Sequence, residues 1–248
     1  MSEIIKTEAV VLSKLNYGDS SNIVSLFTKS HGKLSAIIKG GRSPKSKISF
    51  IADPLNHLQV ILYKKDTREV QILSSADIIS HYSKIKEDLE KLKYSYAILE
   101  LVKKLIPEHE ANERLFNGLN RIFSLFESPD EHLKIIFGRF FMFFLTELGY
   151  EIPIQKCASC GKSNLNSMNL SYNFELGILC DTCKKDYFES FQINSELFNY
   201  LLCLKHNKNI INVNEMVYDK AILFMQSYLK HHISDFSGFK SFQLFKEV

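Results

Sequence analysis

Four of the chain's five cysteines form two matched pairs, Cys157 with Cys160 and Cys180 with Cys183. Such thiols could form a redox dithiol, two disulfides or four ligands for one metal ion. Two cysteines two residues apart bracket a tight turn, so both thiolates can face one ion. The separation of the two pairs also fits a four-cysteine zinc site. The spacing therefore favours one structural zinc ion, without an open coordination position, over two unrelated thiol pairs.

A second group of residues that could do chemistry is basic. No acidic residue lies between Asp19 and Asp53, although that window holds seven basic or imidazole side chains. A solvated charged face is the ordinary interpretation of such a run. Several of these cations, however, lie on a Gly/Pro/Ser-rich segment, where they could neutralise phosphates. The predicted nucleic-acid contacts are Lys39, Arg42, Lys45 and Lys47, with Lys33 nearby on a strand. Lys184 and Lys185, beside the second cysteine pair, are the alternative path.

The elements that must position these cations are predicted as strands. Residues 7–15 are rich in β-branched and apolar residues, which are typical of strands. Residues 22–40 and 55–75 each hold two apolar runs around a short polar turn, so each predicts a hairpin. Gly40, Gly41 and Pro44 predict a loop between the hairpins. Five strands without a helical period indicate a small barrel over residues 1–79.

The remainder of the chain, residues 80–248, has a helical pattern. Apolar residues recur every three or four positions from Ile85 to Ile106, from Leu115 to Phe126 and from Leu133 to Leu148. The pattern returns in two later segments, so the cysteine segment, at about residues 154–188, is an insert between helices. The predicted fold class is α+β. The aromatic stretch at residues 137–150 predicts a buried core helix, whose edge could also form a pocket for a partner.

Other features limit the function classes. The chain has no P-loop, GxGxxG, GxSxG or HExxH motif, so nothing argues for catalysis and we expect no enzyme. No secretory start is visible, and the longest apolar run, Phe140 to Leu145, is far too short to cross a membrane. We therefore expect a cytoplasmic protein without a membrane partner. In that reducing compartment paired cysteines more often hold metal than form disulfides.

Several stretches, taken in order, resemble the RecO family of bacterial recombination mediators. The opening "TEAVVLSKLNYGDSSNIVSLFTKSHGKLSAIIKGGRSPKSK" resembles that of the family almost throughout, including its basic loop. "ILELVKKLIPEHEANERLF" is similar to its helical signature, and "FGRFFMFFLTELGYEIPIQKCASCG" resembles the segment that leads into its zinc knuckle. "SYLKHHIS" resembles its closing helix. "ELGILC" departs from the family, which usually has a Gly-Gly pair before the third cysteine.

The resemblance implies an N-terminal OB-fold DNA-binding domain and a helical domain with an inserted zinc ribbon. It implies binding of single- and double-stranded DNA and annealing of complementary strands. It also implies that the protein acts with RecR, and through the C-terminal tail of single-strand-binding protein (SSB), to load RecA onto SSB-coated DNA. We would then expect it at the nucleoid.

Two other function classes remain open from the residues alone. The chain could be a zinc-ribbon nucleic-acid-binding subunit of an RNA- or DNA-modifying complex, although the sequence has no acid/base or nucleophile constellation for that chemistry. It could also be a protein–protein adaptor whose basic loop is incidental. Steep salt dependence of DNA binding would separate a DNA mediator from an adaptor.

Overall fold

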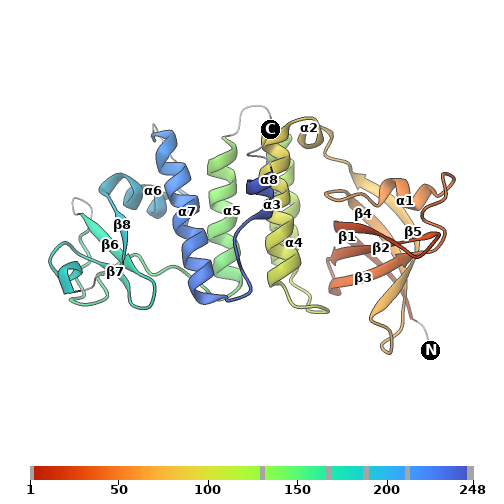
Figure 1. Cartoon of the computed structure of the whole chain (residues 1–248), viewed down its shortest axis with the longest axis horizontal. Helices are drawn as coiled ribbons and strands as arrows, with labels where there is room; N and C mark the ends of the chain where they lie inside the picture. The colour runs from red at the N-terminus through yellow and green to blue at the C-terminus, as the bar shows by residue number, and fades with distance from the viewer. Residues whose placement is uncertain (1–2, 129–131, 166–168, 187–189, 210–212, 245–248) are drawn as a thin grey trace. The chain divides into compact units, whose positions relative to one another are not determined.

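The computed structural model describes residues 3–128, 132–165, 169–186, 190–209 and 213–244. The chain divides into two compact units. The first comprises Met1–Glu131 and Phe239–Val248, and the second comprises His132–Gly238. Figure 1 labels the elements of both units.

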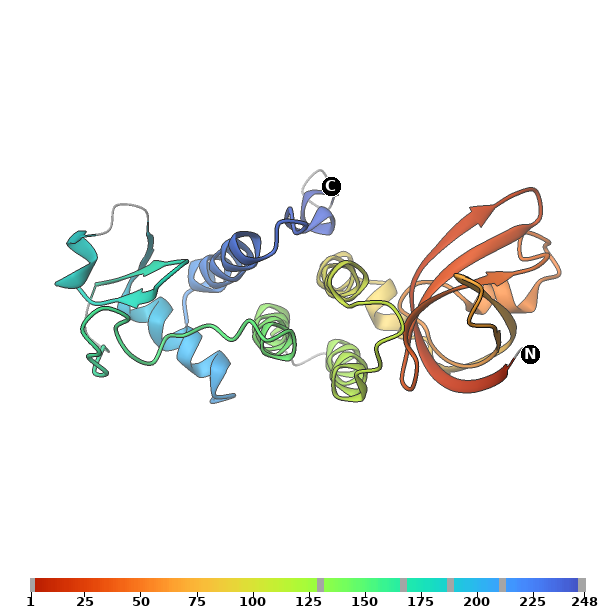
Figure 2. The same ribbon diagram turned by 90° about the horizontal axis from the view of Figure 1, so that it is seen from below.

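The first unit contains a closed five-stranded barrel with the strand order β1-β2-β3-β5-β4. Only β3 and β5 pair in parallel, and the other neighbouring strands are antiparallel. This is the five-stranded Greek-key barrel of the OB fold, and it confirms the predicted hairpins and barrel (Figures 1 and 2). The strands are β1 Glu3–Tyr17, β2 Ser21–Thr28, β3 Gly32–Ile38, β4 His57–Lys64 and β5 Val70–Ser80.

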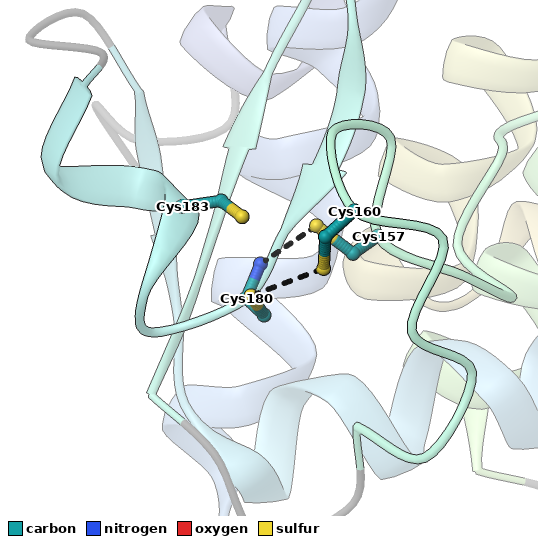
Figure 3. A group of neighbouring side chains, drawn as sticks. All are labelled: Cys157, Cys160, Cys180 and Cys183. Carbon is teal, nitrogen blue, oxygen red and sulfur yellow. Dashed lines mark hydrogen bonds between the residues drawn. The ribbon is translucent and has the colours of Figure 1, made fainter.

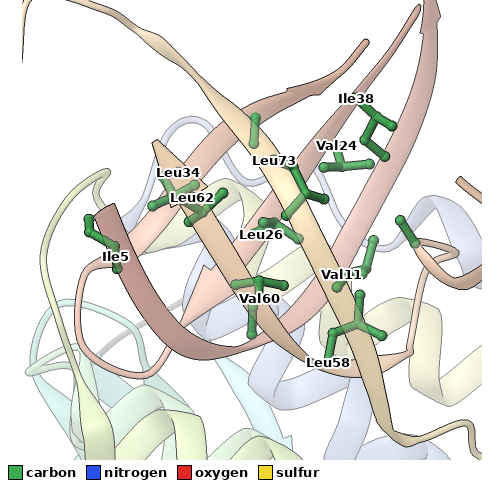
Figure 4. Close-up of a cluster of buried hydrophobic side chains, with 14 residues drawn as sticks. Ile5, Val11, Val24, Leu26, Leu34, Ile38, Leu58, Val60, Leu62 and Leu73 are labelled. Carbon is green, nitrogen blue, oxygen red and sulfur yellow. The ribbon is translucent and has the colours of Figure 1, made fainter. Parts of the chain in front are cut away.

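Alternation along the strands fills the barrel. Successive side chains of a strand point to opposite faces, so every second residue enters the interior. Val24 and Leu26 of β2, for example, are fully buried among aliphatic residues from all five strands (Figure 4). Helix α1, Lys47–Ile51, adds Ile48 and Ile51 to this core. The barrel therefore has an aliphatic core that fixes strand register.

Four further helices complete the described part of the first unit. Helices α2 (Ser83–Lys86), α3 (Leu89–Leu105) and α4 (Glu113–Phe126) follow β5. The rings of Phe27 in β2 and Phe116 in α4 lie 5.9 Å apart, so the barrel and the helices share buried aromatic contacts. The short helix α8, Lys240–Leu244, packs against α3, where the Glu100 carboxylate accepts hydrogen bonds from two of its backbone N–H groups.

The second unit is built on three helices and one small sheet. The helices are α5 (Leu133–Glu147), α6 (Ser195–Lys205) and α7 (Glu215–His232). The sheet has the order β7-β6-β8, and all its pairs are antiparallel. The aromatic residues of α5 are mostly buried, which confirms the prediction of a core helix. The strands are β6 Leu170–Asn173, β7 Gly177–Leu179 and β8 Phe191–Ile193.

The predicted boundary at residues 79 and 80 lies at the end of β5, which closes the barrel at Ser80. The compact units divide at a different place, because α2, α3 and α4 belong with the barrel. That residues 1–79 form a domain of their own therefore stays a prediction.

Candidate metal centre and nucleic-acid interface

The structure brings the four paired cysteines together in the second unit. Their sulfur atoms all lie within 4.8 Å of one another, although the pairs are far apart in the sequence (Figure 3). Cys180 directly follows β7, and Cys183 begins a short 3-10 helix, Cys183–Asp186. Cys203 is the fifth cysteine and is not part of the cluster.

Backbone hydrogen bonds shape the two turns that present these thiols. The Gly161 N–H donates to the Cys157 carbonyl (2.9 Å), and Gly161 has a φ of 74°, which a glycine adopts without strain. In the second turn the Lys184 N–H donates to the Cys180 carbonyl (3.0 Å). The Ala158 N–H donates to the Ile178 carbonyl of β7 (2.7 Å), which fixes the first turn to the small sheet.

The thiols differ in acidity. Burial by itself raises the pKa of Cys157, but hydrogen bonds from the backbone at Cys160, Cys180 and Ser159 outweigh it and lower that pKa to about 6. Hydrogen bonds, chiefly from the Cys183 backbone, also lower the pKa of Cys180. A hydrogen bond with the Ser159 side chain lowers the pKa of Cys183. Hydrogen bonds with the side chains of Cys180, Cys160 and Cys157, together with burial, raise it more, so the pKa of Cys183 is about 12. Adjacent thiolates repel one another, so ionising all four requires a bound cation.

The geometry fits a tetrahedral metal site. The sulfur atoms of Cys160 and Cys180 are 3.8 Å apart, too far for a disulfide bond of about 2.05 Å. A tetrahedron with metal–sulfur bonds of about 2.3 Å has sulfur–sulfur edges of about 3.8 Å. The four cysteines therefore form a site that can hold one metal ion, as the spacing predicted. Four protein ligands would leave no position for a substrate, so the ion would have a structural role.

The predicted basic contacts separate into an exposed group and one buried residue. Lys39, Arg42, Lys45 and Lys47 are all exposed, on the segment between β3 and the first turn of α1. Among the described residues, no hydrogen bond or ion pair engages the ammonium groups of Lys39, Lys45 and Lys47. These three cations are therefore available to an external anion.

Arg42 connects the same segment to the barrel. Its backbone N–H donates to the Ser20 carbonyl (2.9 Å), and its guanidinium Nη1 donates to the Gly18 carbonyl (2.8 Å). Both acceptors lie in the turn between β1 and β2. A guanidinium has five N–H donors, so the bond to Gly18 leaves others free for a phosphate.

Lys33 does not belong with the exposed cations. It is only 8% exposed, and its ammonium group donates to the carbonyl oxygen of Lys103 near the end of α3 (2.7 Å). Burial lowers the pKa of Lys33, Glu108 opposes that effect, and Lys103 adds to it. The ammonium group of Lys33 therefore takes part in the packing of α3 on the barrel, and its contact with phosphates stays a prediction.

Asn22 is a site residue that the sequence did not reveal. It is 3% exposed; its amide group donates to the Asn16 side chain (2.9 Å), and its carbonyl oxygen accepts from the Ser49 hydroxyl of α1 (3.0 Å). A Cβ at Gly41 would lie 2.4 Å from that oxygen. The segment between β3 and α1, which we call the basic segment, therefore passes directly over Asn22. Asn22 thus positions the segment against β1 and α1. An asparagine in a strand gives no local signal of this role.

Three large apolar side chains were also missed. Leu15 and Tyr17 at the end of β1 are 63% and 56% exposed, and Phe50 of α1 is 68% exposed. Tyr17 precedes Gly18, whose carbonyl binds Arg42. Exposed apolar groups beside unpaired cations are a combination that binds unstacked nucleic-acid bases.

A polar hollow of about 360 Å³ lies where the barrel meets the start of α4. Three of its charged side chains pair with one another, since Lys29 lies 3.6 Å from Glu8 and 3.5 Å from Glu113. The buried His57 ring approaches the same Glu8 carboxylate to 3.0 Å. Burial lowers the pKa of His57, Glu8 opposes this, and Lys29 adds to it. These contacts support a structural role for the hollow.

Comparisons with known proteins match nearly the whole chain to one family. The profile for the N-terminal part of recombination protein O matches residues 1–82, and the profile for its C-terminal part matches residues 86–241. No helix in the described ranges is both long and apolar enough to cross a membrane.

Two of the curated relatives are similar over nearly the whole chain, and a third over about two thirds of it. The DNA repair protein RecO of Chloroherpeton thalassium is 29% identical over 99% of both chains. That of Alkaliphilus metalliredigens is 30% identical over 99% of this chain and 100% of its own. That of Chlorobium limicola is 35% identical over 64% of this chain and 61% of its own. This chain belongs to the recombination protein O (RecO) family of DNA repair proteins.

Proposed function

We propose that this chain is a recombination mediator that binds single- and double-stranded DNA without making or breaking bonds. The observation that carries the proposal is the group of exposed, unpaired cations on a loop of an OB-fold barrel, Lys39, Lys45 and Lys47, with Arg42 fixed beside them. Barrels of this kind bind oligonucleotides on the face of strands 2 and 3 and on adjoining loops. The basic segment is one such adjoining loop, since it follows β3 and contacts the turn between β1 and β2.

Phosphate contacts explain why such a protein would act at any sequence. Lysine and arginine neutralise phosphates and release counterions, which gives affinity but little sequence information. A mediator must act wherever single-stranded DNA is exposed, so this mode of binding suits it.

In this proposal the cysteine site holds one zinc ion. Four thiolates in a tetrahedron of this size are the common ligand set of structural zinc. The ion would neutralise the repulsion between thiolates and hold the two turns of the insert together. The residues that would hold it are Cys157, Cys160, Cys180 and Cys183.

The experiment that tests DNA binding is a salt titration. Affinities for a labelled single strand and its duplex are measured by anisotropy at several salt concentrations. Four phosphate contacts predict slopes of log affinity against log salt of about −2.8 for the single strand and about −3.6 for the duplex. An affinity that does not change with salt would contradict the proposal and favour an adaptor.

The resemblance of the sequence to the RecO family suggests finer activities, which are part of the proposal. We propose that the chain anneals complementary strands and, with RecR, helps to load RecA onto SSB-coated DNA in the cytoplasm, at the nucleoid. Annealing can be followed with a fluorophore and quencher on complementary oligonucleotides. RecA loading can be followed by its ATPase on SSB-coated strands, which should begin sooner only when both this chain and RecR are present. Binding of a labelled SSB tail peptide at micromolar protein tests the contact with that partner.

A further inference from the structure

Helix α1 is too short to be stable by itself. It has five residues, Lys47–Ile51. Isolated helices shorter than about 12 residues are marginal in water, because the first turn fixes several residues for a single hydrogen bond. The last carbonyl groups of a helix also have no partner within it. Groups elsewhere in the first unit must therefore hold α1 in its conformation.

One side of α1 packs on the barrel. Ile48 and Ile51 contact the aliphatic core, and the Ser49 hydroxyl donates a hydrogen bond to the Asn22 side chain of β2 (3.0 Å). These contacts involve side chains only. They therefore do not satisfy the backbone carbonyl groups at the end of the helix.

Lys14 of β1 binds one of these carbonyl groups. Its ammonium group donates to the Ser49 carbonyl oxygen (2.9 Å) and forms an ion pair with the Asp53 carboxylate. Asp53 is the acidic residue that ends the acid-free window, and it lies two residues beyond α1. Lys14 thus joins β1 both to α1 and to the chain that follows it. We call Lys14, Asp53 and the Ser49 carbonyl group the Lys14 clamp.

A second carbonyl group has a partner of its own. The side-chain amide of Asn56 donates to the Ile51 carbonyl (2.7 Å), and its side-chain oxygen accepts from the Lys86 ammonium group of α2. Asn56 is fully buried, so this contact cannot be removed without disturbing the core. The side chains of Lys14 and Asp53 are 25% and 48% exposed, so the Lys14 clamp can be removed while the barrel stays folded.

The position of α1 determines where the neighbouring cations lie. The basic segment is fixed near its start, where Arg42 donates to the Gly18 carbonyl, and it leads into α1 at its end. Lys45 lies between these two fixed points, and Lys47 is the first residue of α1. Both cations therefore have a defined position before any phosphate binds.

We infer that Lys14 is a positioning residue for DNA binding, which acts without contacting DNA by holding α1 and the basic segment in the binding conformation. The inference rests on the proposed function. Without the Lys14 clamp, DNA would have to order the segment as it binds, at a cost in backbone entropy. The apparent affinity falls in proportion to the fraction of chains that already have the binding conformation.

A double variant that preserves the net charge tests this role. Lys14→Met with Asp53→Asn removes one positive and one negative charge together with the bond to Ser49. It should bind a labelled single strand about three- to tenfold more weakly than the wild type. The slope of log affinity against log salt should not change, because every cation of the basic segment is still present. Lys14→Arg keeps donors for the same two oxygen atoms and should bind DNA like the wild type.

Another ion pair of the barrel provides the matched control. Lys64 lies 3.2 Å from Asp66, and its side chain is 26% exposed, close to the value for Lys14. Lys64 pairs with Glu3 at the start of β1, whereas Arg42 binds the turn after the end of that strand. Lys64→Met with Asp66→Asn should therefore leave the DNA affinity unchanged. Melting curves show whether both double variants are folded.

Hydrogen exchange of the wild type tests the order of the segment directly. The Phe50 N–H donates to the Ser46 carbonyl (3.3 Å), and the Ala52 N–H donates to the Ile48 carbonyl (3.0 Å). In the free wild type both amides should exchange slowly with deuterium. In the double variant Lys14→Met with Asp53→Asn they should exchange much faster, and saturating DNA should slow them again.

Four results would overturn the inference while leaving DNA binding in place. These are wild-type affinity in the Lys14 double variant, an equal loss of affinity in the Lys64 control, and rapid exchange of both amides in the free wild type. The fourth is a salt slope smaller in magnitude by about 0.7 in the Lys14 double variant, which would make Lys14 itself a phosphate contact. Failure of the wild type to bind either single strand or duplex would instead overturn the proposed function.

Discussion

The ammonium group of Lys33 on β3 donates a hydrogen bond to the carbonyl oxygen of Lys103 on α3, 2.7 Å away. Lys103 lies in the last turn of α3, where backbone carbonyls have no partner within the helix. A cation there satisfies one of these carbonyls and interacts favourably with the helix dipole. The same backbone region is joined to the barrel again, because the His109 N–H donates to the Lys33 carbonyl (2.9 Å). Lys33 thus fastens the barrel to α3.

Lys33→Met should therefore affect stability rather than DNA binding. The variant keeps the apolar stem but loses the hydrogen bond from a charged group to the Lys103 carbonyl, which should lower the free energy of unfolding by about 1.5–3 kcal/mol. Chemical denaturation measures this loss. Lys39→Ala is the matched control: it should change stability by less than about 0.5 kcal/mol and lower the magnitude of the single-strand salt slope by about 0.7. If Lys33→Met instead lowered the salt slope and left stability unchanged, Lys33 would belong to the DNA-binding surface.

Removing a cysteine ligand should release the metal and destabilise the second unit. Elemental analysis of the purified chain should give about one zinc per molecule. Cys180→Ser should lose that zinc and melt at a lower temperature, because binding of a structural ion is coupled to folding. Cys203→Ser, outside the cluster, is the control and should keep the metal. A chain that contains no zinc but a disulfide between the paired cysteines would contradict the proposal.

The parts of the fold and of the candidate site that could be predicted from the sequence are those that depend on residues close together in the chain. The alternation of Ile23 with Val24 predicts a strand, and the spacing of the cysteine pairs predicts their cluster, because both signals are local. The role of Lys33 depends on a helix seventy residues away along the chain, so a lone lysine in a basic window gave no indication of it.

Short elements were beyond the reach of periodicity. Strands β7 and β8 have three residues each, and α1 has five, so each contains little more than one period of its pattern. The loop predicted around Gly40, Gly41 and Pro44 therefore ends at Ser46, the cap of α1, and the short helix after it was not predicted. Helix α8 depends on the distant Glu100 carboxylate, which caps its first turn.

The first unit should lose stability as the pH falls through about 6.5. Burial lowers the pKa of His57 in the folded chain, so the unfolded chain takes up a proton at a higher pH. The free energy of unfolding therefore rises with pH between the pKa of His57 in the folded chain and its ordinary value of 6.5. The stability contributed by neutral His57 is fully present above pH 6.5. Denaturation at pH 7.5, 6.5 and 5.5 should show a smaller loss in His57→Gln than in the wild type. His81→Gln removes an exposed imidazole of the same unit and should lose as much stability between pH 7.5 and 5.5 as the wild type. Equal losses in His57→Gln and wild type would count against this role for His57.

Removing two cations from the basic segment should flatten the salt dependence of DNA binding. Each phosphate contact contributes about 0.7 to the single-strand slope, so Arg42→Ala with Lys45→Ala should reduce its magnitude by about 1.4. Arg42 also donates to the Gly18 carbonyl, so its loss could shift the segment. The pair Lys45→Ala with Lys47→Ala leaves that bond intact and should give the same reduction. Lys103→Ala with Lys104→Ala removes the same charge from an exposed part of α3 and is the matched control. If the control flattened the slope as much as the other two pairs, net charge rather than the basic segment would govern binding, and the DNA path would have to be sought elsewhere, first at Lys184 and Lys185.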